Sequence, residues 1–147
     1  MNSSVYKKQI IMFSAMVIMG ILFNPMNILA YRFSDLYISQ TLFYGGVLMA
    51  SNMMWAHEIV HYLSMGHFNM FVFSAGIILS ISVSILLRQQ LFVDDTQWLR
   101  RMISHHSTAL TTTHKIYNKT SNLKLKKLAK EIIDTQEKEI QLMKSML

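Results

Sequence analysis

The sequence predicts an all-α protein, with three transmembrane helices followed by a two-helix hairpin that forms half of a four-helix bundle. The 147-residue chain is 52% hydrophobic yet has one proline and five glycines, which favours long uninterrupted helices. Its charge is uneven, because most of the Lys, Arg, Asp and Glu residues follow Val93. This break divides the chain into a membrane anchor, residues 1–92, and a hairpin domain, residues 93–147.

Three stretches of the anchor are long enough to cross a bilayer, near residues 10–30, 38–58 and 67–87. A spanning helix needs about 20 mostly apolar residues, and each stretch is nearly free of charge. Asn24-Pro25 weakens the end of the first helix, which we expect to stop early or kink there. Lys7 and Lys8 favour an inside N-terminus, so an odd number of crossings places the hairpin outside.

The sequence of the polar segment, residues 93–147, predicts two antiparallel helices. Asp94 or Asp95 can cap a helix that begins near Thr96, and Ser121 or Asn122 can cap a second helix after a short polar break. Apolar residues recur at helical spacing in both segments. Because two helices cannot cover both apolar faces, we expect a homo-oligomer, most simply a dimer. The alternative is that the hairpin docks on its own membrane spans.

Methionine and histidine gather at one end of this hairpin. Antiparallel pairing brings the stretch from Met102 to His106 near the stretch from Gln136 to Met143. Thioether is a soft ligand and imidazole a borderline one, so this end suits Cu(I) better than zinc.

Residues 57–61, HEIVH, match the zinc-protease pattern H-E-x-x-H, in which Glu58 would be the general base. His67 stands six residues later, where one protease class has its third histidine. However, Ser64 replaces the glycine of that class, and no aspartate lies between Glu58 and Asp94. We therefore expect the match to be coincidental and the protein not to be an enzyme.

A stripe of alternating methionine and histidine offers a different interpretation of the same stretch. Four soft or borderline ligands repeat every four residues along one helix face and predict a possible second metal site: Met53, His57, His61 and Met65. The alternative is a polar helix end at the lipid headgroups.

The hairpin resembles the bacterial family known as domain of unknown function 305. The resemblance rests on M-x-x-H-H from Met102 and Q-x-x-E-I-x-x-M from Gln136, and it covers roughly Asp94 to Met146. It implies a ferritin-like hairpin, an association with copper and, for the whole chain, the membrane-anchored branch of the family. It also implies a set of metal ligands with two polar neighbours: Met102, His105, His106 and Met143, beside Gln136 and Glu139.

Two positions depart from the pattern of that family. Ser104 stands where many members have proline, and Thr112 stands where many copper-binding members have methionine. His114 lies off the usual pattern, about two turns from His106.

These observations predict a membrane-anchored metal-binding protein of copper homeostasis or resistance, with Cu(I) as the bound ion. We expect a bacterial inner-membrane location with the hairpin on the periplasmic side. The alternatives are a non-metal structural or oligomerisation module and, more remotely, a membrane zinc protease. The lipid bilayer and a second copy are the expected partners, with no nucleic acid and no small-molecule substrate.

Overall fold

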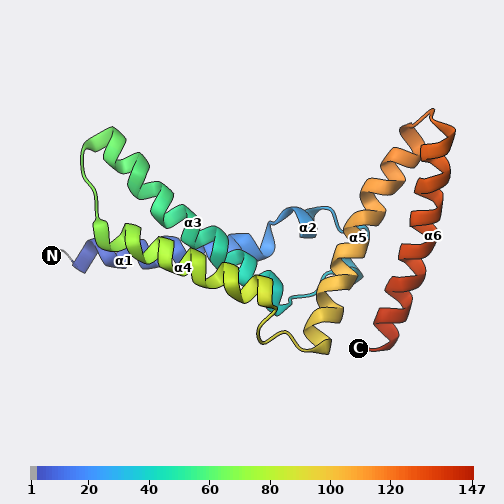
Figure 1. Cartoon of the computed structure of the whole chain (residues 1–147), viewed down its shortest axis with the longest axis horizontal. Coiled ribbons are helices and arrows are strands. Elements are labelled where there is room, and N and C mark those ends of the chain that lie inside the picture. The colour runs from blue at the N-terminus through green and yellow to red at the C-terminus, as the bar shows by residue number, and fades with distance from the viewer. Residues whose placement is uncertain (1–2) are drawn as a thin grey trace. The chain divides into compact units, whose positions relative to one another are not determined.

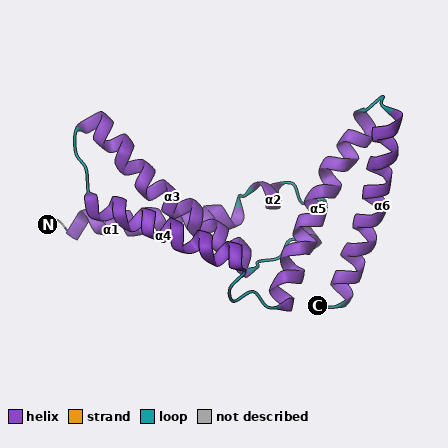
Figure 2. Cartoon of the chain, in the orientation of Figure 1, coloured by secondary structure: helices purple, strands orange, loops and turns teal. Residues whose placement is uncertain are grey.

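The structure, a computed structural model, describes residues 3–147, and this part of the chain is helical without a strand (Figure 2). The predicted all-α class is therefore confirmed. Figure 1 labels the main helices. In chain order the elements are α1 (Ser3–Leu22), α2 (Pro25–Ile28), the 3₁₀ helix η1 (Phe33–Asp35), α3 (Gln40–Met65), α4 (Met70–Gln89), α5 (Asp95–Lys119) and α6 (Leu123–Ser145).

The chain divides into two compact units. Helices α1, α3 and α4 form the first unit, which ends at Phe92. The second unit joins residues 93–147 to a segment from far earlier in the chain, residues 23–39, which we call the linking segment. The predicted anchor, residues 1–92, includes this segment, whereas in the structure it packs on the hairpin.

In the first unit, α3 packs against both α1 and α4. Glycines allow close approach at each crossing. A Cβ added to Gly46 would lie 2.9 Å from the carbonyl oxygen of Val17 on α1, and one added to Gly76 would lie 3.0 Å from the backbone nitrogen of Trp55 on α3. Small residues at helix crossings are typical of helices that pack in membranes.

Two stretches are long and apolar enough to cross a bilayer, Tyr6–Ile28 and Met70–Gln89. Of the three predicted spans, the middle one does not meet the same test. Helix α3 is as long as the others, but polar side chains such as Asn52, His57 and Glu58 lower its hydropathy. Many apolar side chains of the two qualifying stretches are exposed, including Ile10, Ile11, Ile18, Met70, Phe71, Ile78 and Ile81.

The first stretch is interrupted where the sequence predicts it. Helix α1 ends at Leu22, and Asn24 caps the short helix α2, of which Pro25 is the first residue. The Asn24 side chain accepts a hydrogen bond from the backbone N–H of Asn27 at 3.1 Å. Proline suits this first position because its missing N–H would have no helical partner there.

In the second unit, α5 and α6 run side by side as the expected hairpin (Figure 1). Asp94 caps α5 by accepting from the backbone N–H of Gln97 at 2.8 Å. Asn122 caps α6 in the same way, with two backbone donors. The core between the helices consists of Leu99, Ile103, Leu110, Ile133, Ile140 and Met143.

Candidate metal site

Part of the predicted ligand set lies together at the α5 N-terminal half of the hairpin. Met143 is buried in the core, and Met102 packs against the same core cluster. His106 follows Met102 by one turn, and its Nδ1 lies 3.1 Å from a carboxylate oxygen of Glu139 on α6. Two thioethers therefore belong to or border the α5–α6 core, and one imidazole–carboxylate pair bridges the same two helices.

The surroundings of His106 favour its neutral form. Its side chain is only 13% exposed. Burial lowers the pKa of this imidazole below its usual value, and the neighbouring His105 lowers it further, while Glu139 opposes the shift. A neutral imidazole is the form that binds a metal ion. The Glu139 oxygen is at ion-pair distance but is not aligned for a hydrogen bond, so Nδ1 has no hydrogen-bond partner among the described residues.

The other predicted residues contribute less. His105 is exposed, because consecutive helical residues point about 100° apart. Thr112 is exposed as well, and its hydroxyl donates to the carbonyl of Ala109 at 3.0 Å. His114 stacks on Tyr31 of the linking segment, with ring centroids 4.9 Å apart. Gln136 has a buried side-chain oxygen with no hydrogen-bond partner in the described part of the chain.

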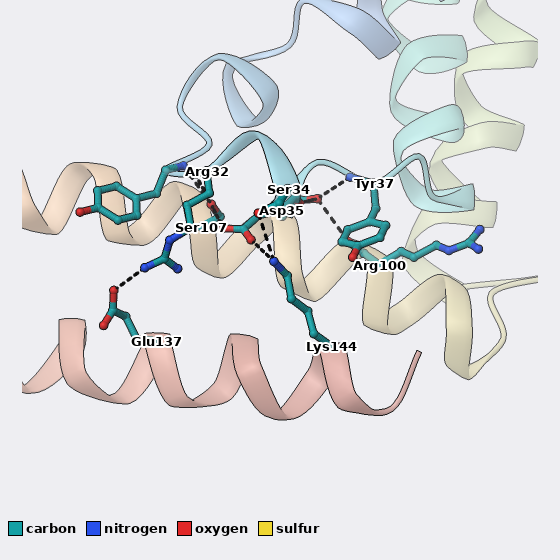
Figure 3. Close-up of polar contacts among 10 residues, drawn as sticks. Arg32, Ser34, Asp35, Tyr37, Arg100, Ser107, Glu137 and Lys144 are labelled. Atoms are coloured by element: carbon teal, nitrogen blue, oxygen red, sulfur yellow. Dashed lines mark hydrogen bonds and ion pairs between the residues drawn. The ribbon is translucent and has the colours of Figure 1, made fainter.

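The linking segment is fixed to the hairpin through a buried carboxylate (Figure 3). Asp35 is fully buried, and Lys144 of α6 lies 2.5 Å from its Oδ1. The Ser107 hydroxyl of α5 donates to Oδ2 at 2.7 Å. On the same segment, Arg32 reaches Glu137 of α6 at 2.8 Å, but this pair is largely exposed.

Two serines on α5 complete this attachment. Ser104 and Ser107 are one turn apart and buried. The Ser104 hydroxyl donates to the carbonyl of Asp35 at 2.8 Å and accepts from the backbone N–H of Tyr37 at 3.3 Å. Ser107 accepts from the backbone N–H of Tyr31 at 2.9 Å. Proline at position 104 could form neither contact, so this departure from the family pattern fits the presence of the linking segment.

The second candidate stretch has a different composition from the predicted stripe. His57 and His61 line a cavity of about 350 Å³ at the turn between α3 and α4, and His67 joins them there. Met53 and Met65 do not line this cavity, and their exposed fractions are 43% and 68%.

Glu58 has a structural contact inside the same cavity. Its side chain is 5% exposed, and its Oε2 accepts a hydrogen bond at 2.9 Å from the backbone N–H of Asn69. Asn69 caps α4, so this bond holds the start of that helix against α3. Across residues 3–147, no group of three or more His, Cys, Asp or Glu side chains is already arranged to hold a metal ion.

The residues that attach the linking segment were not among the predicted functional residues. Two features of the sequence could have indicated them. Arg32 and Asp35 are isolated charges within the apolar half of the chain, and Ser104 and Ser107 place two hydroxyls on the buried side of α5, which is a weaker indication. No periodicity within the segment itself could indicate where it docks.

Comparisons with known proteins agree on the C-terminal part of the chain. The family described as "Domain of unknown function (DUF305)" matches residues 86–147. The chain is also similar to "Uncharacterized protein L153" of Acanthamoeba polyphaga mimivirus, with 34% identity over 128 residues, which cover 84% of this chain and 81% of the relative. No solved structure gives a significant match.

The viral relative shows how much of the chain the similarity covers, and it bears on the expected bacterial location. Its 128 aligned residues are far more than residues 86–147 contain, so the similarity extends into the apolar helices. A viral relative gives no support to the expected bacterial inner-membrane location or periplasmic orientation.

Proposed function

Since the chain belongs to the family of this mimivirus protein and carries the DUF305 domain in residues 86–147, we propose that it is a membrane-anchored protein whose hairpin binds a soft metal ion. The proposed ion is Cu(I), and the proposed ligands are Met102, His106 and Met143. The supporting observations are that Met143 lies in the α5–α6 core, that Met102 packs against this core, and that His106, one turn after Met102, lies beside Glu139 of α6.

The donor set fits this ion. Thioether sulfur is a soft ligand and neutral imidazole a borderline one, a combination that favours Cu(I) over zinc. With the Glu139 carboxylate beside Nδ1 of His106, the Nε2 atom remains as the ligand. A bound Cu(I) would give the hairpin a means to buffer or pass on copper. His105, exposed beside this site, is a candidate entry residue rather than a core ligand.

The anchor is proposed to cross the membrane three times. The linking segment follows α1 and the hairpin follows α4, yet both belong to one compact unit and must lie on the same side of a bilayer. If α1 and α4 both cross, α3 must cross as well, because two crossings would place these parts on opposite sides. Helix α3 has 26 residues, about 39 Å, which exceeds a hydrocarbon core of about 30 Å.

Two polar residues of α3 are compatible with this crossing because they are buried, whereas Asn52 is exposed and accepts a hydrogen bond from the Trp55 ring. Ser51 is fully buried, and its hydroxyl donates to the carbonyl of Val47 at 2.8 Å. Glu58 is buried near the end of the helix against the α4 N-terminus. Polar groups within a membrane are expected to face the helix bundle in this way. The outward side chains include Phe43, Met49, Ile59, Val60 and Leu63.

A second candidate function is a non-metal module for self-association. Its support is the set of apolar side chains left exposed on the hairpin: Trp98, Ile116, Leu125, Leu128 and Leu142. A second copy that covered them would complete a four-helix bundle. In both cases we propose a binding protein rather than an enzyme.

Cu(I) titration of the full chain in detergent, by competition with a colorimetric chelator, tests the metal function. We expect tight binding that the double variant Met102→Leu, His106→Gln abolishes, because it removes two of three ligands while keeping side-chain volume. His105→Gln and the exposed Met65→Leu are controls that should bind as the original chain does. Unchanged binding by the double variant would reject this site, and absent binding by the original chain would leave the self-association function.

A further inference from the structure

We propose that His57, His61 and His67 form a second metal site, which binds a divalent cation of the Zn²⁺ class. The site lies at the turn between α3 and α4, within the first unit, and the inference does not rest on copper binding by the hairpin. It keeps His57 and His61 of the predicted methionine–histidine stripe, and it replaces the two methionines with His67, the third histidine of the zinc-protease pattern.

The three imidazoles surround one cavity. It has a volume of about 350 Å³, and its remaining lining residues are Gln9, Glu58, Phe68 and Asn69. The ring centroids of His57 and His61 are 5.9 Å apart, and those of His61 and His67 are 6.2 Å apart. With Zn–N distances of about 2.0–2.1 Å, two imidazoles on one tetrahedral ion have centroids roughly 5 Å apart. The rings are therefore about 1 Å from the separation that a shared ion requires.

Backbone contacts already select the tautomer that a metal needs. Nδ1 of His61 lies 3.0 Å from the carbonyl oxygen of His67, and Nδ1 of His67 lies 3.0 Å from that of Met65. A carbonyl oxygen can only accept, so each Nδ1 carries the proton and each Nε2 keeps its lone pair. Metal-binding histidines commonly donate their second ring nitrogen to a carbonyl in this manner.

Two buried polar atoms at the cavity have no hydrogen-bond partner among the described residues. Nδ1 of His57 is buried without a hydrogen-bond partner in the described chain, 3.9 Å from Oε1 of Glu58. The side-chain oxygen of Gln9 is likewise buried and unpartnered, and Gln9 lines the same cavity. Buried polar groups are nearly always satisfied, so an ion with its bound water would account for both.

The chemistry of the set favours a borderline cation over Cu(I). Three nitrogen donors beside a carboxylate match Zn²⁺, whereas the thioethers of Met53 and Met65 lie outside the cavity. The approach of the rings requires a small movement of the turn. Gly66, with φ of +70° and open space around it, lies between His61 and His67 and allows that movement.

Co²⁺ and Zn²⁺ binding to the full chain in detergent tests the site. We expect Co²⁺ to give the visible absorption of a tetrahedral nitrogen site and Zn²⁺ to displace it. His67→Ala should weaken binding by more than the roughly 10–100-fold that loss of an outer-shell partner costs. His67→Gln should behave alike and guards against misfolding, since His67 is exposed.

Two control variants distinguish this site from the methionine–histidine stripe and from the metal site proposed on the hairpin. Met65→Leu should bind Co²⁺ as the original chain does, and so should His106→Gln. Binding that survives His67→Ala and His67→Gln would overturn the proposal. Binding that is lost in His106→Gln would assign the divalent ion to the hairpin and overturn it too.

Discussion

At the scale of single residues, Asp35 joins the linking segment to the hairpin. It is a fully buried carboxylate, and a buried charge is costly unless it is paired and hydrogen bonded. Lys144 supplies the opposite charge, and Ser107 supplies a hydrogen bond. The pair joins the linking segment to the end of α6, so its loss should release the segment.

Lys144→Met should therefore lower the free energy of unfolding of the second unit by about 3–5 kcal/mol, because Asp35 would stay buried without its partner. Lys138→Met is the matched control on α6, where an exposed lysine should matter by less than about 0.5 kcal/mol. Denaturant unfolding followed by Trp98 fluorescence in a Trp55→Phe background measures both. Equal stabilities of the two variants would contradict the role given to Asp35.

At the scale of elements, the first unit depends on close helix crossings. Gly46 lets α3 approach α1, whereas the adjacent Gly45 has no atom within 4 Å of an added Cβ. Replacing each glycine with alanine therefore compares a packed position, Gly46, with an open position, Gly45, on the same helix.

Gly46→Ala should destabilise the first unit by about 1–3 kcal/mol through overpacking against Val17 and Ile21. Gly45→Ala should be neutral or stabilising by up to about 1 kcal/mol, since alanine is the better helix former. Thermal unfolding of the two variants in detergent gives the comparison. A Gly46→Ala variant at least as stable as Gly45→Ala would show that the crossing is looser than described.

Elements with their own periodicity could be predicted from the sequence, and the contacts between distant elements could not. The caps Asp94 and Asn122 identified the hairpin because local hydrogen bonds fix a helix start. The linking segment has no such pattern, and its position depends on Asp35 meeting α5 and α6, about 70 to 110 residues later.

The candidate sites also combine features that local spacing predicts with features that depend on contacts between distant elements. Spacing predicted that Met102 and Met143 lie at the contact of the two helices, because helix geometry and antiparallel pairing determine their positions. It also grouped His57 with His61. The zinc-protease spacing singled out His67 as a third histidine, but it could not fix where that ring lies, because the turn after α3 determines its position. Nor could it separate Met53 and Met65 from the cavity, since both share a helix face with the histidines.

At the scale of the whole molecule, one chain combines an apolar three-helix unit with a polar DUF305 unit. The linking segment connects them in an unusual order, because it leaves α1 but folds with α5 and α6. The similarity to the mimivirus protein extends over both units, so the two proteins share this combination. The proposed three crossings place the linking segment and hairpin on one side and the α3–α4 turn on the other.

Labelling of single cysteines in sealed vesicles tests this membrane arrangement most directly, since the chain has no cysteine of its own. Suitable exposed positions are Phe33→Cys in the linking segment, Asn118→Cys in the hairpin and Ser64→Cys at the turn. An impermeant thiol reagent should modify the first two from the same side and Ser64→Cys only from the opposite side. Modification of all three from one side, or of Phe33→Cys and Asn118→Cys from different sides, would contradict the proposed anchor.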